Sequence, residues 1–222
     1  RSEYSASDEG RINKGAAKIL FGKVYLTKGD FQKAKDKLAE VVEHESEYGF
    51  GLHKDYHANW LRDTEAGIEA VLYIEYKEPP FQHNGEMALA GPKYSIPGSL
   101  GISALNEADI PTQELYDQFD NRDLRKKTNF KTEFAHLKTG EILKSSIPLS
   151  GKFWVEGLET GDRCDVNMHI IRYADAILMY AEALNEVGES TKALAMLNRI
   201  RERAFGDDSG NFKPMSKDEF RT

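Results

Sequence analysis

The spacing of apolar residues predicts a helical hairpin over residues 11–44. Apolar side chains return there every three or four positions, which is the period of an α-helix. They are Ala16, Ile19, Leu20, Val24, Phe31, Ala34, Leu38 and Val41. Gly29 and Asp30 interrupt the pattern. Because Gly permits a tight turn and Asp is a favourable N-cap, we predict that one helix ends and another begins at this point.

A second segment, residues 170–205, repeats this design, with a break at Gly188. The two hairpins share small or apolar residues at relative positions 0, 3, 7 and 12. These are Gly22, Tyr25, Gly29 and Ala34 in the first hairpin and Ala181, Leu184, Gly188 and Ala193 in the second. This spacing resembles the tetratricopeptide repeat, in which small residues let two helices approach closely.

Between the hairpins lies a long insertion, residues 45–168, in which the helical period is lost. Residues 69–77 are rich in Val, Ile and Tyr and predict a strand. Residues 111–120 begin with Pro-Thr and predict a short helix. Residues 79–106 are rich in Pro, Gly, Ser and Asn, and we expect a functional or disordered loop without core elements there. The predicted fold class is therefore mainly α, with helical hairpins and an irregular insertion that contains short strands.

Three charged residues interrupt the apolar helix of the second hairpin: Arg172, Asp175 and Glu182. Asp175 and Glu182 are separated by two helical turns, which does not suit an acid–base pair. Arg172 and Asp175 are three residues apart and can form an ion pair. We predict a structural charge network that an arginine among Arg199, Arg201 and Arg203 completes, so that Asp175→Ala would destabilise the fold by a few kcal/mol, roughly the cost of an unpaired buried charge.

Composition narrows the possible functions. The chain has 222 residues and a net charge of −7, which argues against nucleic acid as a partner. Its single cysteine, Cys164, excludes an internal disulfide, and no apolar run approaches the length of a membrane span. Ser216 and Glu219 form a capping-box pattern that begins a helix close to the last residue, from which we expect a piece of a longer protein.

Motifs for catalysis and metal binding are weak. The sequence holds no GxSxG, Walker or HExxH pattern, so we expect no enzyme and no cofactor. His53 and His57 have a helical metal-binding spacing, and acidic residues that could attract calcium occur at Asp117, Asp120 and Asp123 and in residues 206–211. Surface histidines, an acidic helix end and a solvated turn explain these patterns more simply, and no metal site is predicted.

Aromatic residues in the insertion are the better candidates for binding. Aromatic faces stack on sugar rings, while neighbouring polar side chains supply hydrogen bonds. The candidate ligand-binding residues are Phe81, His83, Asn84, Tyr94 and Trp154. Trp60 follows Tyr56 in a periodic segment, and we expect it in the core.

Four stretches together resemble the SusD/RagB family. They are "GRINKGAAKILFGKVYLTKGDFQKA", "DYHANW" followed by "EAVLYIEYK", "PTQELYDQFDNRDLR", and "IIRYADAILMYAEALNEVGESTKALAMLNRIRERA". The resemblance implies that residues 1–222 are part of a single SusD-like domain. It also implies a non-catalytic lipoprotein at the cell surface of the outer membrane, which binds glycans or other nutrients and delivers them to a SusC-like TonB-dependent transporter.

The sequence also departs from this family. Family members are commonly about twice as long and carry a lipid-bearing N-terminal cysteine, a role that the internal Cys164 cannot fill. Membrane contact would depend on that absent anchor. The family has no fixed binding motif, so no ligand residue is carried over. Two other functions are weighed: a glycan-degrading enzyme, which lacks a carboxylate pair, and a tetratricopeptide adaptor, which would need contiguous repeats.

Overall fold

The computed structural model describes residues 11–77, 84–96, 100–103, 105–155, 157 and 164–221. The chain forms two compact units, each of which has its own apolar core. The first unit takes described residues from 11–55, 66–73 and 169–221, and the second takes them from 56–65 and 74–168. The mainly helical fold class predicted from the sequence is confirmed.

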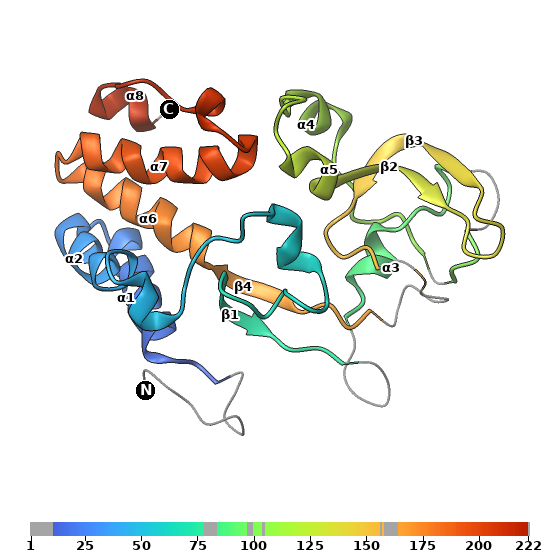
Figure 1. Cartoon of the computed structure of the whole chain (residues 1–222), viewed down its shortest axis with the longest axis horizontal. Helices are drawn as coiled ribbons and strands as arrows, with labels where there is room; N and C mark the ends of the chain where they lie inside the picture. Colours follow the sequence, from blue (N-terminus) through green and yellow to red (C-terminus); the bar gives the residue numbers. More distant parts are fainter. Residues whose placement is uncertain are drawn as a thin grey trace. The chain divides into compact units, whose positions relative to one another are not determined.

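The first unit is built from two helical hairpins (Figure 1). Its helices are α1 (Lys14–Thr27), α2 (Phe31–Val42), α6 (Tyr173–Glu186), α7 (Ser190–Phe205) and the short α8 (Lys217–Arg221). The helix α2 packs against α6, so the first hairpin lies against the second. The strands β1 (Ala70–Ile74) and β4 (Met168–Arg172) pair as a two-stranded sheet.

Small residues explain the close contact within the hairpins. A Cβ atom added to Gly22 would lie 2.5 Å from Cγ of Leu38, so α1 and α2 can approach this closely only with glycine there. Gly29 and Gly188 have φ angles of +74° and +88°, which a residue with a side chain rarely adopts. Ala34 and Ala193 are fully buried. The tetratricopeptide-like spacing therefore reflects close packing of the two helices within each hairpin, and both predicted hairpins are confirmed.

The predicted capping box is also present. The hydroxyl oxygen of Ser216 accepts a hydrogen bond from the N–H of Glu219, and the Glu219 carboxylate accepts one from the N–H of Ser216 at 2.7 Å. These bonds satisfy amide groups that a helix leaves open at its first turn, and α8 follows directly.

The charge network differs from the prediction. Arg172 does not pair with Asp175; its guanidinium bonds the fully buried carboxylate of Glu69 at 2.6 Å. Arg203 from α7 bonds the other oxygen of Glu69 at 2.9 Å, so one of the three predicted arginines does complete the network. Asp175 instead lies 3.6 Å from Lys23 at the surface, and the predicted pairing was wrong because α6 begins at Tyr173 and leaves Arg172 on the preceding strand.

Glu182 does not belong to this network among the residues that the structure describes. It lies on the exposed side of α6, one position away from the buried Ala181 and Ala183. Partial burial raises its pKa, and the neighbouring Glu186 carboxylate adds to that effect. Its predicted role as a buried structural charge is therefore corrected.

The second unit is built around a β-hairpin. Its strands are β2 (Phe130–Ala135) and β3 (Ile142–Ser150), and its short helices are α3 (Glu86–Ala90), α4 (Gln113–Gln118) and α5 (Arg125–Asn129). The strands are antiparallel, and Phe130 pairs with Ser150. The strand predicted over 69–77 is found as β1, and the helix predicted over 111–120 is found as α4.

Residues 79–106 were expected to hold no core elements, and this was wrong for the part that the structure describes. Met87 on α3, Ile96, Leu100 and Leu105 are all buried in the core of the second unit. Trp60 is also buried there, as predicted. The apolar residues are separated by Gly, Pro and Ser, so each enters the core from a separate turn and no period reveals them.

The buried Glu69 gives a test of the corrected network. We expect Glu69→Ala to lower the free energy of unfolding by about 3–5 kcal/mol, because two arginines lose their shared carboxylate. Asp175→Ala removes only a surface pair, so it should cost less than about 1 kcal/mol. Urea denaturation of both variants measures the difference. Equal losses in the two variants would show that Glu69 does not hold the network.

The contact at Gly22 gives a second test. We expect Gly22→Val to destabilise the fold by about 1–3 kcal/mol, since the new side chain must displace the buried Leu38. Lys23→Val places the same side chain at the next, half-exposed position of α1 and controls for helix propensity. Thermal unfolding followed by circular dichroism compares them; an unchanged melting temperature for Gly22→Val would refute close packing at this point.

Candidate ligand-binding site

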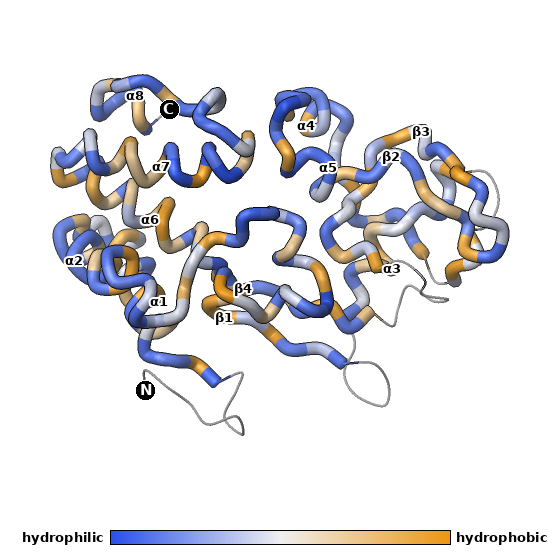
Figure 2. Tube along the Cα trace, in the orientation of Figure 1, coloured by the Kyte–Doolittle hydropathy of each residue, from blue (hydrophilic) through white to orange (hydrophobic). Residues whose placement is uncertain are grey.

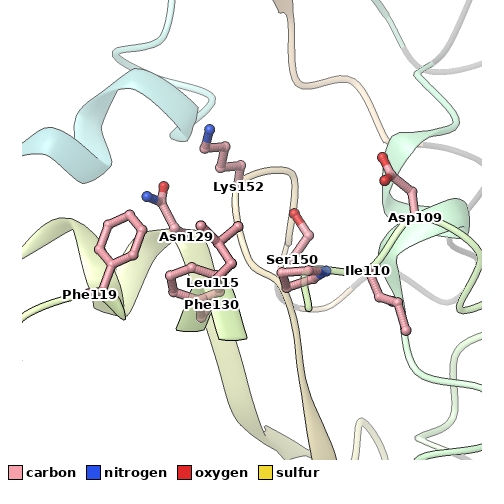
Figure 3. Close-up of a pocket in the computed structure, with 9 residues that line it drawn as sticks. Asp109, Ile110, Leu115, Phe119, Asn129, Phe130, Ser150 and Lys152 are labelled. Atoms are coloured by element: carbon pink, nitrogen blue, oxygen red, sulfur yellow. The ribbon is translucent and has the colours of Figure 1, made fainter. Parts of the chain in front are cut away.

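A cavity of about 380 Å³ opens in the second unit where the β2–β3 hairpin ends. Its lining comes from α4 and the segment before it, from the start of β2, and from the end of β3 (Figure 3). The lining residues are Asp109, Ile110, Pro111, Leu115, Phe119, Asn129, Phe130, Ser150 and Lys152. Because Phe130 and Ser150 pair across the hairpin, strand register brings two parts of the lining together.

Apolar side chains make up part of the cavity lining. Phe130 is buried, and the rings of Tyr116 and Phe119 meet it edge-on, with centroids 5.3 and 5.0 Å away. Leu115 and Ile110 remain partly exposed and lie on the cavity wall. The Thr112 side chain fixes the start of α4 by accepting the N–H of Leu115 at 3.2 Å.

Polar side chains make up the rest of the lining, and the core holds two of them in place. The Asn129 side-chain oxygen accepts a hydrogen bond from the Tyr56 hydroxyl at 3.1 Å. The ammonium of Lys152 lies 5.3 Å from the centroid of the Trp60 ring, a distance that suits a cation–π contact. Gly151, just after β3, lets the chain pass close to α5, because an added Cβ would lie 2.5 Å from the carbonyl oxygen of Thr128.

Asp109 reaches the cavity from a separate segment. Its N–H donates to the carbonyl oxygen of Leu89, the fourth residue of α3, at 3.2 Å. Two residues earlier, Glu107 has a positive φ of 53°, and its carboxylate accepts N–H bonds from Lys93, Tyr94 and Ser95. Partial burial acts to raise the pKa of Glu107, but these three bonds outweigh it and lower the pKa. The segment on either side of Tyr94 is thereby tied to the one that carries Asp109.

This arrangement suits a neutral or charged polyol better than a metal or a reaction centre. An apolar face with a few fixed polar groups is the usual design of a small-molecule site. In the described part of the chain, no cluster of His, Cys, Asp and Glu could hold a metal ion. Asp120 and Asp123, once considered for calcium, each bond an arginine, Arg122 and Arg125 respectively, and the Arg122 bonds lower the pKa of Asp120 to about 2.

Several residues predicted for ligand binding lie elsewhere. Phe81 and His83 lie outside the described residues. Asn84 is buried, donates to the carbonyl of Val166 at 2.8 Å, and accepts the N–H of Glu86 at 2.8 Å. Both ends of its amide therefore serve the fold.

The two predicted aromatic residues that the structure describes differ in exposure. Trp154 is 9% exposed and meets Phe134 edge-on at 4.5 Å, so it lies in the core. Tyr94 is 76% exposed and offers an aromatic face to solvent. As a ligand contact, Tyr94 stays a prediction. Cys164 is fully buried, and burial raises the pKa of its thiol to about 11.

The lining residues were missed for a physical reason. Leu115 and Phe119 fall within the helix predicted over residues 111–120, but their role in a cavity depends on strands that approach α4 only in three dimensions. Ser150 ends a strand that no motif marks, and Lys152 follows it. The Pro111-Thr112 helix start was the available signal, and it marks the helix without indicating the strands that complete the lining.

Residues 148–222 match the model of the SusD family. The SusD-like protein P2 of Formosa agariphila is 29% identical over 93% of this chain and 44% of its own length. A SusD superfamily structure from Parabacteroides distasonis has a TM-score of 0.80 at 24% identity, covering 96% of this chain and 48% of that one.

A further structure has a named ligand. Surface glycan-binding protein A from Bacteroides thetaiotaomicron, solved in complex with laminarihexaose, has a TM-score of 0.76 at 17% identity over 96% of this chain and 51% of that one. The resemblance to the SusD/RagB family predicted from the sequence is confirmed by these similarities. It spans less than half the length of the curated relatives it matches.

One buried carboxylate in the second unit has a raised pKa. Glu65 is 5% exposed, and its carboxylate accepts the N–H of Asn167 at 2.8 Å. Burial raises the pKa of Glu65 to about 7; the nearby Asp165 and Glu75 carboxylates add to this rise, and Arg62 opposes it. Because the folded pKa lies above the unfolded value, the folded protein binds a proton that the unfolded chain releases between about pH 4.5 and 7.

This shift gives a pH-dependent prediction. The contribution of Glu65 to the free energy of unfolding should fall as the pH rises from about 4.5 to 7. Glu65→Gln keeps a hydrogen-bond acceptor for Asn167 and removes the titratable group. The free energy of unfolding of the variant, relative to that of the unsubstituted chain, should therefore rise by on the order of 2–3 kcal/mol between pH 5 and 8. Urea denaturation at several pH values measures this, with the exposed Glu141→Gln as control. If the free energy of unfolding depended on pH in the same way in both glutamine variants and in the unsubstituted chain, the predicted role of Glu65 would be contradicted.

Proposed function

We propose that this chain is part of a cell-surface protein that binds oligosaccharides without cleaving them. The observation that carries the proposal is the cavity at the end of β3, in a fold that a laminarihexaose-bound glycan-binding protein shares. The protein would pass its ligand to a SusC-like TonB-dependent transporter in the outer membrane. The family resemblance supports this partner and this location.

The lining suits a sugar in particular. A pyranose ring has an apolar face of C–H groups, which packs against aromatic and aliphatic side chains. Phe130, Leu115 and Ile110 offer such a surface, while Asn129 and Ser150 offer hydrogen-bonding groups for the hydroxyls at its edge. Both properties occur in one cavity, as Figure 3 shows.

The cavity does not suit glycoside cleavage. Glycosidases use two carboxylates that flank the bond to be broken. Within the lining that the structure describes, Asp109 is the one carboxylate. This supports binding without catalysis, which also agrees with a role in delivering an intact ligand.

Contact with the membrane is proposed from the family alone. The SusD/RagB resemblance implies a lipid anchor at an N-terminal cysteine, and Cys164 is buried within the second unit. Among the described residues, every helix is too short or too polar to span a bilayer.

Calorimetric titration tests the proposal. We expect saturable binding of at least one of laminarihexaose, maltohexaose, xylohexaose and tetragalacturonate. Leu115→Ala should weaken that binding roughly fivefold to tenfold, because it removes apolar contact worth about 1–1.5 kcal/mol from the cavity wall. Leu124→Ala is the matched control, since Leu124 is similarly exposed but lies outside the lining.

Tyr94→Ala in the same titration tests the remaining aromatic prediction. A loss of affinity would extend the binding surface from the cavity to this exposed ring. Binding that neither Leu115→Ala nor Tyr94→Ala weakens would refute the cavity as the site. Absence of binding to all four oligosaccharides would refute the proposed glycan ligand.

A further inference from the structure

Two of the segments that line the cavity are rich in basic residues, although the chain as a whole is acidic. Residues 119–131 and 150–155 supply Phe119, Asn129, Phe130, Ser150 and Lys152 to the lining. These two segments contain six basic and two acidic side chains, whereas the chain has a net charge of −7 and the third lining segment, residues 109–118, holds three acidic side chains and no basic one. Most of the segment that joins α4 to α5 is coloured as hydrophilic in Figure 2.

Both acidic side chains of residues 119–131 form ion pairs with arginines. Asp120 holds the guanidinium of Arg122 with a shortest distance of 2.6 Å, and Asp123 holds that of Arg125 in the same way. Each contact involves two nitrogens of the arginine. The two arginines are thereby neutralised, and the positive excess comes from lysines.

Three lysines of these segments lie against aromatic rings. Lys126 lies 4.3 Å from the centroid of Tyr116 and donates to the carbonyl oxygen of Phe119 at 3.0 Å. Lys131 lies 5.0 Å from the centroid of Trp154. Lys152 lies over Trp60 and itself lines the cavity. A cation–π contact holds an ammonium group in position and adds no opposite formal charge. These contacts therefore place positive charge at defined points.

The opposite side of the cavity has the opposite charge. Figure 3 shows Lys152 and Asp109 on either side of Ser150. A ligand with one anionic group would therefore meet attraction at Lys152 and repulsion at Asp109, while its hydroxyls could donate to the Asp109 carboxylate. The charges thus favour one orientation of a singly charged sugar ring over the reverse.

We propose that this cavity selects oligosaccharides with an anionic substituent, a carboxylate or a sulfate, which Lys152 binds. The inference rests on the proposed function, because it assigns the ligand class of the same site. The apolar wall around Phe130 takes the face of the sugar ring, and the anionic group lies at the end of the cavity where Lys152 is held over Trp60.

Matched pairs of ligands separate charge from shape. Tetragalacturonate is compared with its methyl-esterified form, and a sulfated carrageenan tetrasaccharide with its desulfated form. We expect at least one anionic ligand to bind more tightly than its neutral partner by roughly tenfold, the effect of a charge-assisted hydrogen bond. Which pair shows the difference identifies carboxylate or sulfate as the recognised group.

Two further measurements identify the electrostatic origin. Raising the salt concentration from about 0.02 to 0.5 M should weaken binding of the anionic ligand and leave its neutral partner nearly unchanged, because added ions screen exposed charges. Lys152→Met should reduce the affinity ratio between the anionic ligand and its neutral partner roughly tenfold, and Lys152→Arg should keep most of that ratio. Lys144→Met is the control, since Lys144 is an exposed lysine of β3 that pairs with Glu133.

The possible outcomes distinguish the two proposals. Equal binding of charged and neutral partners, or a charge preference that survives Lys152→Met, would overturn the selectivity and leave glycan binding intact. Failure of every charged and neutral oligosaccharide to bind would overturn glycan binding and the selectivity together. A circular dichroism melting curve for Lys152→Met confirms that the variant is folded, and Lys152→Arg keeps the test decisive if it is not.

Discussion

The carboxylate of Glu69 is the interaction on which the first unit depends. It is fully buried, and it meets Arg172 before α6, Arg203 near the end of α7, and the N–H of His53 at 3.2 Å. The backbone oxygen of Glu69 also accepts the N–H of Tyr173 at 2.8 Å, which starts α6. One residue at the entry to β1 thereby joins the sheet to both helices of the second hairpin. A buried carboxylate without its partners would cost several kcal/mol, so this position constrains register, helix start and hairpin packing together.

Aromatic packing has the corresponding role in the second unit. Tyr56 and Trp60 lie in contact in its core, with ring centroids 4.6 Å apart. From this pair, the Tyr56 hydroxyl reaches Asn129, and the Trp60 ring lies beside Lys152. The polar wall of the cavity is therefore positioned by the same residues that stabilise the fold. Such support fixes side chains in advance, and this reduces the entropy that a ligand must overcome on binding.

The sequence was informative where interactions are local. The turns at Gly29 and Gly188 and the capping box at Ser216 depend on residues within a few positions of one another, and all were predicted correctly. The partner of Arg172 was not, because Glu69 lies 103 positions away and looks like the edge of a strand in the sequence. A nearby acid at helical spacing, Asp175, gave a simpler local explanation. Periodicity identifies which face of a helix is buried, but it does not identify which distant charge that face will meet.

The same limit applies with more force to the cavity, and it explains why resemblance to a family does not determine the ligand. The net charge of −7 describes the chain as a whole, whereas a ligand responds to the potential near its own site. That local potential depends on pairing: Asp120 and Asp123 pair with two arginines, and Lys126 and Lys152 lie against aromatic rings. Changing a single rim residue would alter this balance without touching the hairpins, since none of the lining belongs to the first unit. A stable helical scaffold and a separately formed binding surface therefore allow one fold to serve ligands of different charge.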